Sequence, residues 1–273
     1  MDKLGSNKPS SDDQIPQNVL SLFARSAAVD DSKAINLNCI DSELVDSLYP
    51  FQKEGIQMAI ARNGRIILAD DMGLGKSIQA LGIVAYYRLE WPLLIITPAS
   101  MVSSWHEQVR RWLPTIPTDR IVVAFDSRTE LVGIVNITSY DLATKLLPTC
   151  SVRFKVIIAD ECHALKNRES KRSKTLVPIL QDACRAILLS GTPALSRPME
   201  LYPQIQAVQS KLFPKFFGFG RRYCNGQKGY FGWDFKGASN LRELQLVLER
   251  TVMIRRTKDS VLSQLPRKLR HQV

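Results

Sequence analysis

Short apolar runs alternate with amphipathic stretches from about Leu48 to Ser190, and this alternation constrains the fold more than any other feature. Runs of four to six apolar residues between turn residues are typical of strands buried on both faces. The expected strands are Arg65–Ala69, Leu93–Thr97, Arg120–Ala124, Gly133–Thr138, Phe154–Asp160 and Arg185–Ser190, and the expected helices between them are Lys76–Leu89, Met101–Trp112 and Lys171–Gln181. Such alternation predicts an α/β fold, a parallel sheet flanked by helices. Ligands of these sheets bind beyond the carboxyl ends of the strands.

The two flanks of this central part have different patterns. Residues 1–40 are rich in Ser, Asp, Asn and Gln, which indicates a flexible leader with a short helix near Val19–Ala27. After Pro198 the strand pattern stops, and residues 199–264 indicate helices with aromatic-rich loops. We therefore expect a polar leader over residues 1–47, a sheet domain over 48–197 and a helical protrusion over 198–273.

Composition excludes several classes of protein. No apolar run approaches the roughly 20 residues of a membrane helix, and the first residues contain no apolar core of a secretion signal. The five cysteines are odd in number and form no CxxC pair, so neither a disulfide framework nor a zinc ribbon is indicated. A reduced intracellular compartment fits best, although these properties do not separate cytosol from nucleus.

The net charge of +11 is concentrated in the last quarter of the chain. Residues 1–210 hold 23 Lys/Arg and 22 Asp/Glu, a balance of +1, whereas residues 211–273 hold 14 and 4, a balance of +10. A polyanion, most simply nucleic acid, fits this excess, and a solvated basic face fits it equally. Residues 213–235 interleave aromatics with cations, a pattern typical of a nucleic-acid surface or of packing onto the sheet domain. We favour packing for most aromatics and nucleic-acid contact for some cations.

The strongest motif is ILADDMGLGKSIQAL, residues 67–81, which is a strand, a glycine-bearing loop and the start of a helix. In this context backbone N–H groups and a helix N-terminus face phosphates. Lys76 would neutralise the β- and γ-phosphates of a nucleotide, and Ser77 would hold Mg²⁺. Asp70 stands where G-x-x-x-x-G-K-[ST] has its first glycine, so the general pattern is incomplete. The expected nucleotide-binding residues here are Asp70, Asp71, Met72, Gly73, Leu74, Gly75, Lys76 and Ser77.

A second motif, FKVIIADECH at residues 154–163, ends an apolar strand in two adjacent carboxylates. Such a pair is costly to bury unless a cation meets it, and Mg²⁺ bound with ATP is the natural partner. Asp160 would hold the metal, and Glu161 would orient and deprotonate the attacking water. Cys162 and His163 would be only two adjacent ligands, which does not favour a zinc site.

Three lesser signals complete the pattern. In ILLSGTPALSR, residues 187–197, a strand runs into Ser190, Gly191 and Thr192, a loop suited to sensing the state of a nucleotide. Trp105 and Trp112 lie seven residues apart on one helix face, which is typical of core packing. The basic segment 167–174 could touch DNA, but charged loops are usually only solvated.

In this order, the three motifs resemble helicase motifs I, II and III. LYPFQKEG at 48–55 resembles the glutamine motif, TPASMVSSWHEQVRRW at 97–112 resembles motif Ia, and ITSYDL at 137–142 resembles a further motif of the same lobe. MIRRTKDSVLSQLPRK at 253–268 is similar to the segment between the two lobes of Swi/Snf-type ATPases. EWPLLIITPAS, SRPMELY, RYCNG and GASNLRELQLVL are similar to the annealing-helicase branch, which includes the HepA-related proteins. The resemblance covers roughly residues 48–273.

The resemblance implies a RecA-like lobe of a P-loop NTPase and a nuclear, ATP-driven, DNA-dependent translocase. Members of this branch rewind unpaired strands and remodel stalled forks in DNA repair. The cofactors would be ATP and Mg²⁺, and the partners double-stranded or forked DNA, a single-strand-binding protein and other replication factors. The implied catalytic residues are Lys76, Asp160 and Glu161; Gln52 would contact adenine; His163, Ser190, Gly191 and Thr192 would couple the sites; and Thr97, Pro98, Ala99 and Ser100 would face DNA.

Two residues depart from the pattern of the branch, and one region is missing from it. Cys162 stands where the branch usually has Ser, and Ser77 replaces the commoner Thr. The second lobe, with its arginine finger, does not follow Val273 in this sequence, so we expect this chain alone to bind nucleotide with weak or no turnover. The alternatives are a non-catalytic, ATP-switched DNA-binding or regulatory module and a small-molecule kinase. DNA binding would argue against the kinase.

Overall fold

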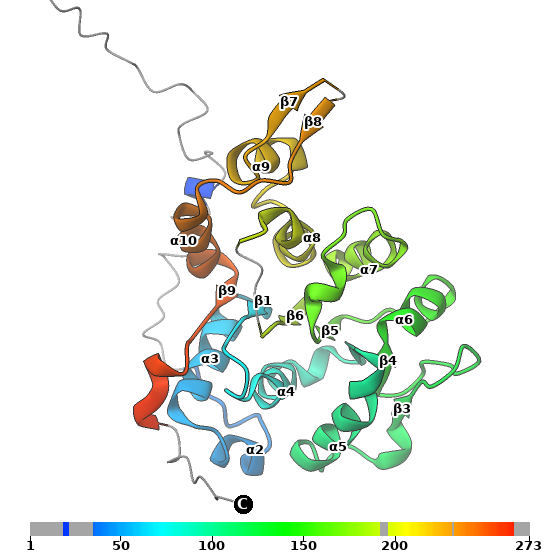
Figure 1. Ribbon diagram of the computed structural model, residues 1–273. Coiled ribbons are helices and arrows are strands. Elements are labelled where there is room, and N and C mark those ends of the chain that lie inside the picture. The colour runs from blue at the N-terminus through cyan, green and yellow to red at the C-terminus, as the bar shows by residue number, and fades with distance from the viewer. Residues whose placement is uncertain (1–18, 22–34, 192–195, 231, 265–273) are drawn as a thin grey trace, which may run out of the picture.

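The computed structural model describes residues 19–21, 35–191, 196–230 and 232–264. A seven-stranded, wholly parallel sheet in the order β3-β4-β2-β5-β6-β1-β9 forms its centre (Figure 1). The strands are β1 (Arg65–Leu68), β2 (Leu93–Thr97), β3 (Ile121–Val123), β4 (Val135–Ser139), β5 (Val156–Ala159), β6 (Arg185–Leu189) and β9 (Met253–Ile254). The predicted α/β class with a parallel sheet is confirmed.

Helices cover both faces of the sheet, because alternate residues of each strand belong to two separate apolar clusters. In β1, Ile66 and Leu68 pack into one cluster and Ile67 into the other. The first cluster includes residues of α2 (Ser42–Asp46), α3 (Pro50–Ala61), α4 (Lys76–Tyr86) and α5 (Val102–Trp112), and the second those of α6 (Tyr140–Leu146), α7 (Lys171–Asp182), α8 (Pro198–Gln209), α9 (Phe216–Tyr223) and α10 (Leu241–Thr251). Short 3-10 turns are η1 (Arg88–Glu90), η2 (Ala99–Met101), η3 (Thr118–Arg120), η4 (Leu147–Thr149), η5 (Cys162–Leu165) and η6 (Asp259–Gln264).

The six predicted strands are confirmed with slightly shifted ends. The prediction that strands end before Pro198 was wrong. β9 pairs with β1, as the N–H groups of Ile67 and Ala69 donate to the carbonyls of Val252 and Ile254 at 2.7 Å each. A two-residue strand is too short to show the alternation by which strands are recognised in a sequence. The C-terminal part therefore returns to the sheet after its helices.

The N-terminal leader also needs a correction within the described residues. Leu37, Ile40 and Leu44 are buried in the cluster that holds α3 and α4, so residues 35–47 are packed rather than flexible. These apolar residues are too widely spaced among polar ones to stand out in the sequence. Of the predicted helix near Val19–Ala27, the described residues 19–21 are helical and the rest lies outside the described part.

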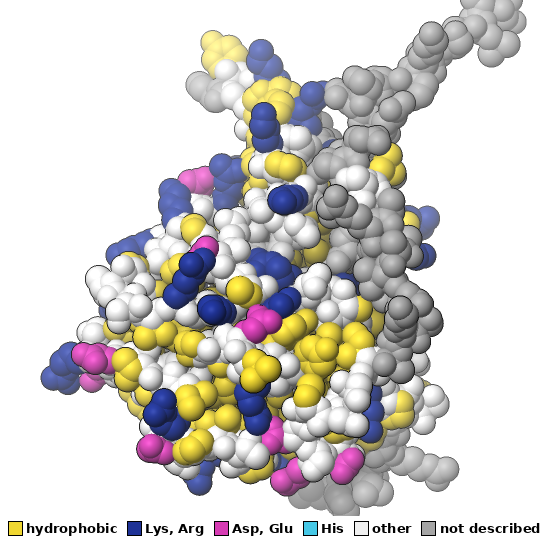
Figure 2. Space-filling view, turned by 180° about the vertical axis from the view of Figure 1, so that it is seen from behind, with side chains coloured by type: hydrophobic (Ala, Val, Ile, Leu, Met, Phe, Trp, Pro, Cys, Tyr) yellow, Lys and Arg dark blue, Asp and Glu magenta, His cyan; other side chains and the backbone are white. Residues whose placement is uncertain are grey.

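Residues 210–240 project from the sheet domain as α9 and a small antiparallel hairpin, at the top of Figure 1. The hairpin consists of β7 (Gln227–Gly229) and β8 (Gly232–Asp234). From behind, Lys, Arg and hydrophobic side chains are mixed over this projecting part (Figure 2). Among the helices that the structure describes, none has the length and apolar character needed to cross a membrane.

Candidate nucleotide site

The glycine loop connects the carboxyl end of β1 to the N-terminus of α4. Gly73 and Gly75 have positive φ angles of 86° and 72°, and Gly75 caps the helix. A Cβ atom on Gly75 would lie 2.4 Å from Nε2 of Gln52. Position 75 therefore requires glycine both for its left-handed backbone and for the close approach of Gln52.

Lys76 holds its ammonium group over the loop by backbone contacts alone. Nζ donates to the carbonyl oxygens of Asp70 at 2.9 Å and Asp71 at 3.4 Å. Among the described residues, no acid forms an ion pair with this half-buried lysine. A cation without a carboxylate partner, beside a helix N-terminus, fits a phosphate group. Ser77 follows in the first turn of α4, half-buried, where its hydroxyl suits a phosphate-bound Mg²⁺.

Gln52 lies behind the loop and supports it. Its Nε2 donates to the carbonyl of Leu74 at 3.0 Å, and its Oε1 accepts from the backbone N–H of Tyr49 at 2.9 Å, closing a capping box on α3. Its side chain is buried, and these two hydrogen bonds engage both ends of the amide. Its contact with adenine stays a prediction.

Asp160, at the end of β5, is oriented by donors from three other segments. Its Oδ2 accepts from Nε1 of Trp105 at 2.8 Å and from Oγ1 of Thr97 at 3.3 Å. Its Oδ1 accepts from the N–H of Glu161 at 2.9 Å, and its carbonyl accepts from the hydroxyl of Tyr140 at 2.8 Å. These bonds fix the carboxylate at the carboxyl end of the sheet, where the glycine loop also lies.

Two expectations change with this network. Thr97 was predicted to face DNA, but it is fully buried and bonded to Asp160, so its side chain is not at the surface. Trp105 is in the core, as predicted, and in addition its indole N–H holds Asp160. Of the other residues predicted to face DNA, Ala99 and Ser100 are exposed and Pro98 is half-buried. Their contact with DNA stays a prediction.

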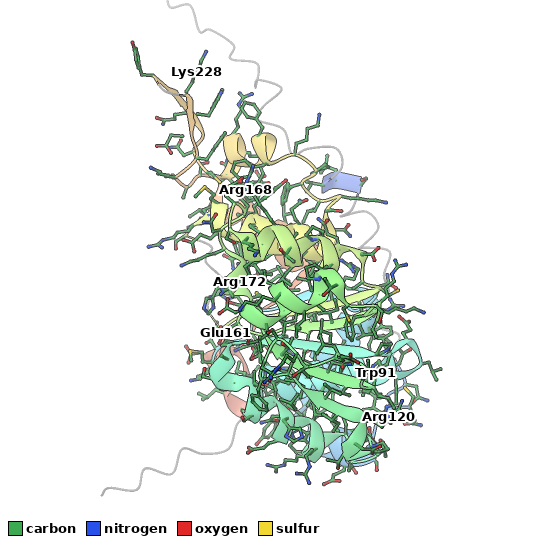
Figure 3. All side chains as sticks on the ribbon, turned by 90° about the vertical axis from the view of Figure 1, so that its right-hand side faces the viewer. Trp91, Arg120, Glu161, Arg168, Arg172 and Lys228 are labelled. Atoms are coloured by element: carbon green, nitrogen blue, oxygen red, sulfur yellow. The ribbon has the colours of Figure 1, made fainter. Side chains whose placement is uncertain are left out.

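Glu161 turns the chain sharply after Asp160. Its φ of 47° is in the left-handed region, which costs a non-glycine residue on the order of 1–3 kcal/mol. Its Oε2 lies 3.1 Å from Nδ1 of His163, and its side chain is about one-third exposed. Figure 3 shows Glu161 on the face that lies to the right in Figure 1. The strained turn thus presents one carboxylate outward while its neighbour stays buried.

Cys162 points inward from the same turn. It is fully buried, and its thiol donates to Oε1 of Gln204 in α8 at 3.2 Å. Burial first, and then the carboxylates of Glu161 and Asp160, raise the pKa of this thiol well above its usual range. No cluster of metal-binding His, Cys, Asp or Glu side chains occurs among the described residues.

The third motif lies beside the glycine loop because β6 is the neighbour of β1. The N–H of Ser190 donates to the carbonyl of Leu68 at 3.1 Å. A Cβ atom on Gly191 would lie 2.8 Å from Cγ of Met72 and 3.7 Å from Nζ of Lys76. Thr192 lies outside the described residues. Since β5, β6 and β1 are parallel neighbours, all three motifs meet at the carboxyl ends of these strands.

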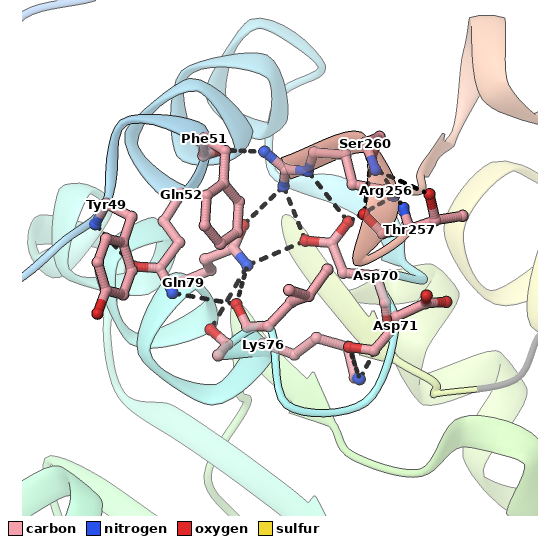
Figure 4. A network of polar contacts seen from close by, with 12 residues as sticks. Tyr49, Phe51, Gln52, Asp70, Asp71, Lys76, Gln79, Arg256, Thr257 and Ser260 are labelled. Carbon is pink, nitrogen blue, oxygen red and sulfur yellow. Dashed lines mark hydrogen bonds and ion pairs between the residues drawn. The ribbon is translucent and has the colours of Figure 1, made fainter. Parts of the chain in front are cut away.

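Arg256, which was not among the predicted site residues, comes from the segment after β9 and joins the glycine loop (Figure 4). Its Nη2 lies 2.8 Å from Oδ2 of Asp70 and 2.8 Å from Oε1 of Gln79. Its backbone N–H and Nε also donate to Asp70, and its guanidinium donates to the carbonyl of Phe51. A Cβ atom on Gly55 would lie 2.3 Å from Nη2, so this glycine makes room for the guanidinium. The signal was Asp70 itself, because a buried carboxylate needs a cation.

The carboxylates of Asp70 and Asp71 therefore bind protein groups. Asp70 is fully buried against Arg256, and Oδ2 of Asp71 accepts from the N–H of Lys258 at 3.0 Å. The side chain of Asp70 is therefore engaged by the protein, and the expected contact of this residue with nucleotide stays a prediction. Their backbone carbonyls receive Lys76, so both residues still shape the loop.

Curated proteins are similar in sequence to this chain. A SWI/SNF-related matrix-associated actin-dependent regulator of chromatin subfamily A-like protein 1 from Xenopus laevis is 47% identical over 265 residues, covering 95% of this chain and 28% of that protein. The human DNA annealing helicase and endonuclease ZRANB3 is 45% identical over 249 residues, covering 87% of this chain and 23% of that protein.

The fold also matches the Sulfolobus solfataricus SWI2/SNF2 ATPase core in complex with dsDNA, with a TM-score of 0.67 and 23% identity over 86% of this chain and 49% of that one. The chain thus spans about a quarter of the length of the two curated relatives. The SNF2-related domain matches residues 51–273, which include the glycine loop, the Asp160–Glu161 pair and Arg256. The chain therefore belongs to the family of SNF2-related domains.

Proposed function

We propose that this chain is the ATP-binding lobe of a DNA-dependent ATPase and DNA translocase, an annealing helicase that remodels replication forks in nuclear DNA repair. One observation carries the proposal: Lys76, which has no carboxylate partner in the part of the chain that the structure describes, lies in a glycine loop at the carboxyl end of the sheet, where Asp160 and Glu161 also lie. A phosphate-binding cation beside two differently placed carboxylates is what nucleotide hydrolysis requires. The names of the curated relatives describe an annealing helicase and a chromatin regulator.

In the proposed mechanism the loop amides and Lys76 bind the β- and γ-phosphates. Ser77 and Asp160 would hold Mg²⁺, which when bound neutralises phosphate charge. Trp105 and Thr97 keep Asp160 directed toward the site. The carboxylate of Glu161, about one-third exposed, orients the attacking water and accepts its proton, while His163 holds that carboxylate in place.

Ser190 and Gly191 would transmit the state of the nucleotide. Gly191 lies against Met72 and Lys76, so a shift of the glycine loop on loss of the γ-phosphate would be transmitted to the end of β6. We propose double-stranded or forked DNA as the partner on the exposed surface of Ala99 and Ser100. A single-strand-binding protein and other replication factors are further proposed partners.

Turnover by these 273 residues alone is proposed to be weak. An arginine that stabilises the transition state is worth roughly 10³–10⁵ in rate in related phosphoryl-transfer systems. In motors of this kind that arginine belongs to a second lobe. The isolated chain is therefore expected to bind ATP with little hydrolysis.

The test measures ATP affinity, and ATP hydrolysis with and without fork DNA, in the wild type and in Lys76→Ala. Arg128→Ala is the matched control, because it removes an exposed cation near β3, at the opposite side of the sheet from the loop. Lys76-dependent binding is expected, with or without DNA-stimulated turnover. Binding that survives Lys76→Ala would contradict the nucleotide site. Binding without turnover, even with the second lobe supplied in trans, would favour an ATP-switched regulatory module.

A further inference from the structure

We propose that α9 and the β7–β8 hairpin form a separate contact for unpaired nucleic acid, in which bases stack on Phe217 and Trp233 and cations bind the phosphates. The inference deepens the proposed function, since it specifies where a single strand would bind. It concerns residues that do not belong to the glycine loop, and it needs no nucleotide.

The structure divides the aromatic residues of this region into two groups. Phe213, Phe219 and Tyr223 are buried, with ring centroids 5.0 to 5.4 Å apart, and they pack the projecting part onto α8. Phe217 and Trp233 are 47% and 41% exposed. Packing therefore explains the first group and leaves the rings of the second group accessible to a ligand.

The rings of Phe216, Phe217, Trp233 and Phe235 pack on one another and form an aromatic platform, which holds the two exposed rings in place. Phe217 and Trp233 meet edge to face at 4.9 Å, and Trp233 stacks on Phe235 at 6.0 Å with an angle of 7° between the rings. Phe235 packs against Phe216 at 5.1 Å and lies so close to α9 that a Cβ atom on Gly220 would be 2.5 Å from its ring. Rings held in this way lose little conformational freedom when a base stacks on them.

The charge of the platform suits a polyanion. Residues 215–236 contain five Lys or Arg and one acid, Asp234, a balance of +4. Arg222 is engaged internally with Glu243 at 2.7 Å. The guanidinium of Arg221 lies 5.9 Å from the Trp233 ring, and Lys228 is at the end of the hairpin (Figure 3). Cations arranged around flat, accessible rings are typical of proteins that bind single strands.

The ligand is a single strand rather than a duplex or an acidic peptide. In a duplex the faces of the bases are stacked on each other, so rings on a surface cannot reach them without unstacking. An acidic peptide would satisfy the cations but offers no flat faces to Phe217 and Trp233. Only unpaired bases use both features.

The aromatic platform contacts the loop that follows the Asp160–Glu161 turn. Arg168, in the loop after the Asp160–Glu161 turn, lies with its guanidinium 4.2 Å from the centre of the Phe216 ring, while its Nε binds Glu169. Figure 3 shows Lys228, Arg168, Arg172 and Glu161 one below another on the same side of the molecule. A strand displaced from DNA on this side would meet the hairpin.

The experiment compares binding of a labelled 20-nucleotide oligo(dT) and of a blunt 20-base-pair duplex by fluorescence anisotropy, with the complete 273-residue chain. The variants are Phe217→Ala/Trp233→Ala and Lys228→Ala/Lys236→Ala. Phe125→Ala is the control, because Phe125 is an exposed aromatic just after β3, at the far edge of the sheet. Thermal unfolding checks that each variant is folded, and Trp233→Phe keeps a stacking ring should the double variant be unstable.

The aromatic variant is expected to weaken oligo(dT) binding roughly tenfold or more, with duplex and ATP affinity unchanged within about twofold. The cation variant should lower the slope of log affinity against log salt by about 1.4, or 0.7 per cation. Trp233→Phe should keep most of the affinity while losing the tryptophan quenching that accompanies binding.

Equal losses for single strand and duplex, or no loss for either, would overturn the proposal. So would binding of poly-glutamate that competes fully with oligo(dT) and depends on the same rings. If the wild type showed no ATP binding that depends on Lys76, the proposed function would be contradicted instead. The difference in affinity between single strand and duplex could still be measured in that case.

Discussion

Arg256 and Asp70 form a buried ion pair, 2.8 Å between Nη2 and Oδ2, across 186 residues of sequence. The carboxylate of Asp70 is fully buried, and the arginine side chain is 13% exposed. The pair joins the glycine loop to the segment that follows β9, because the N–H of Asp71 also donates to the carbonyl of Arg256 at 3.0 Å. Any movement of that C-terminal segment is thereby connected to the loop that would hold phosphate.

Arg256→Ala is expected to lower the free energy of unfolding by about 3 kcal/mol, because it leaves a buried carboxylate without its cation. The backbone N–H of residue 256 and Nε2 of Gln79 still donate to Asp70, which keeps the loss at the lower end of the range. Urea denaturation measures it, with Arg255→Ala as the neighbouring control. Similar losses for the two variants would contradict the importance of the pair, whereas partial recovery in Arg256→Met/Asp70→Asn would support it.

The motifs could be predicted from the sequence because their chemistry depends on contiguous residues. Gly73 to Ser77 and the Asp160–Glu161 pair each combine a strand end with the side chains that a nucleotide needs, all within a few positions. The partners of these residues come from distant segments. Nothing in the sequence near Trp105 indicates that its indole bonds Asp160, and nothing near Arg256 indicates Asp70.

The errors have the same physical origin. Burial of Thr97 follows from the pairing of β2 with both β4 and β5, which a local pattern does not reveal. β9 has only two residues, and the three-residue strands of the β7–β8 hairpin, Gln-Lys-Gly and Gly-Trp-Asp, are too short to show apolar alternation. Short strands of this kind depend on tertiary pairing rather than on their own sequence preference.

Trp105→Phe is expected to weaken binding of Mg²⁺-ATP about tenfold, with Mg²⁺-free ATP unaffected. The substitution keeps an aromatic ring in the core but removes a hydrogen bond to a carboxylate, worth roughly 1.5–3 kcal/mol. Titration calorimetry with and without Mg²⁺ measures the difference. Trp112→Phe is the control, since its N–H binds Gln108 instead. Equal losses in both titrations would mean that Trp105 only packs.

Gly75→Ala is expected to weaken nucleotide binding about tenfold or more, because its left-handed backbone disfavours a side chain and its Cβ would meet Gln52. Gly218→Ala is the contrasting variant. It lies within α9 with no atom within 4 Å of the added Cβ, so it should stabilise the protein by about 0.5–1 kcal/mol. Nucleotide affinity and thermal unfolding are measured for both. Unchanged affinity in Gly75→Ala would contradict the assigned loop geometry.

Cys162 and Cys224 are expected to resist alkylation in the folded protein. Burial raises the pKa of Cys224 to about 11 and that of Cys162 further, and the thiolate is the form that reacts. Cys39 and Cys184 are exposed and serve as internal controls. Iodoacetamide at pH 8, followed by peptide mass spectrometry, should modify the exposed pair and leave the buried pair until urea is added. Modification of Cys162 at the rate of Cys184 would show that the Asp160–Glu161 turn opens readily.

We expect Glu243 to make a pH-dependent contribution to the stability of the projecting part. Its carboxylate receives Nε and Nη2 of Arg222 and the hydroxyl of Tyr223, each at 2.7 Å. The Arg222 bonds come first among the causes that hold the pKa of Glu243 below its ordinary value of 4.5. A lowered pKa means that the contribution is fully present above 4.5 and is lost as the pH falls through the folded-state pKa.

Glu243→Gln should therefore lower the free energy of unfolding by about 1–2 kcal/mol at pH 7, a figure reduced for the partial exposure of the pair. The difference from wild type should shrink progressively between pH 5 and about pH 3. Chemical denaturation across this range measures it, with Glu107→Gln as an exposed control on α5. No difference from wild type at pH 7, or a difference that does not change with pH, would contradict a contribution from the ionised carboxylate, because glutamine keeps the shape of glutamate without its charge.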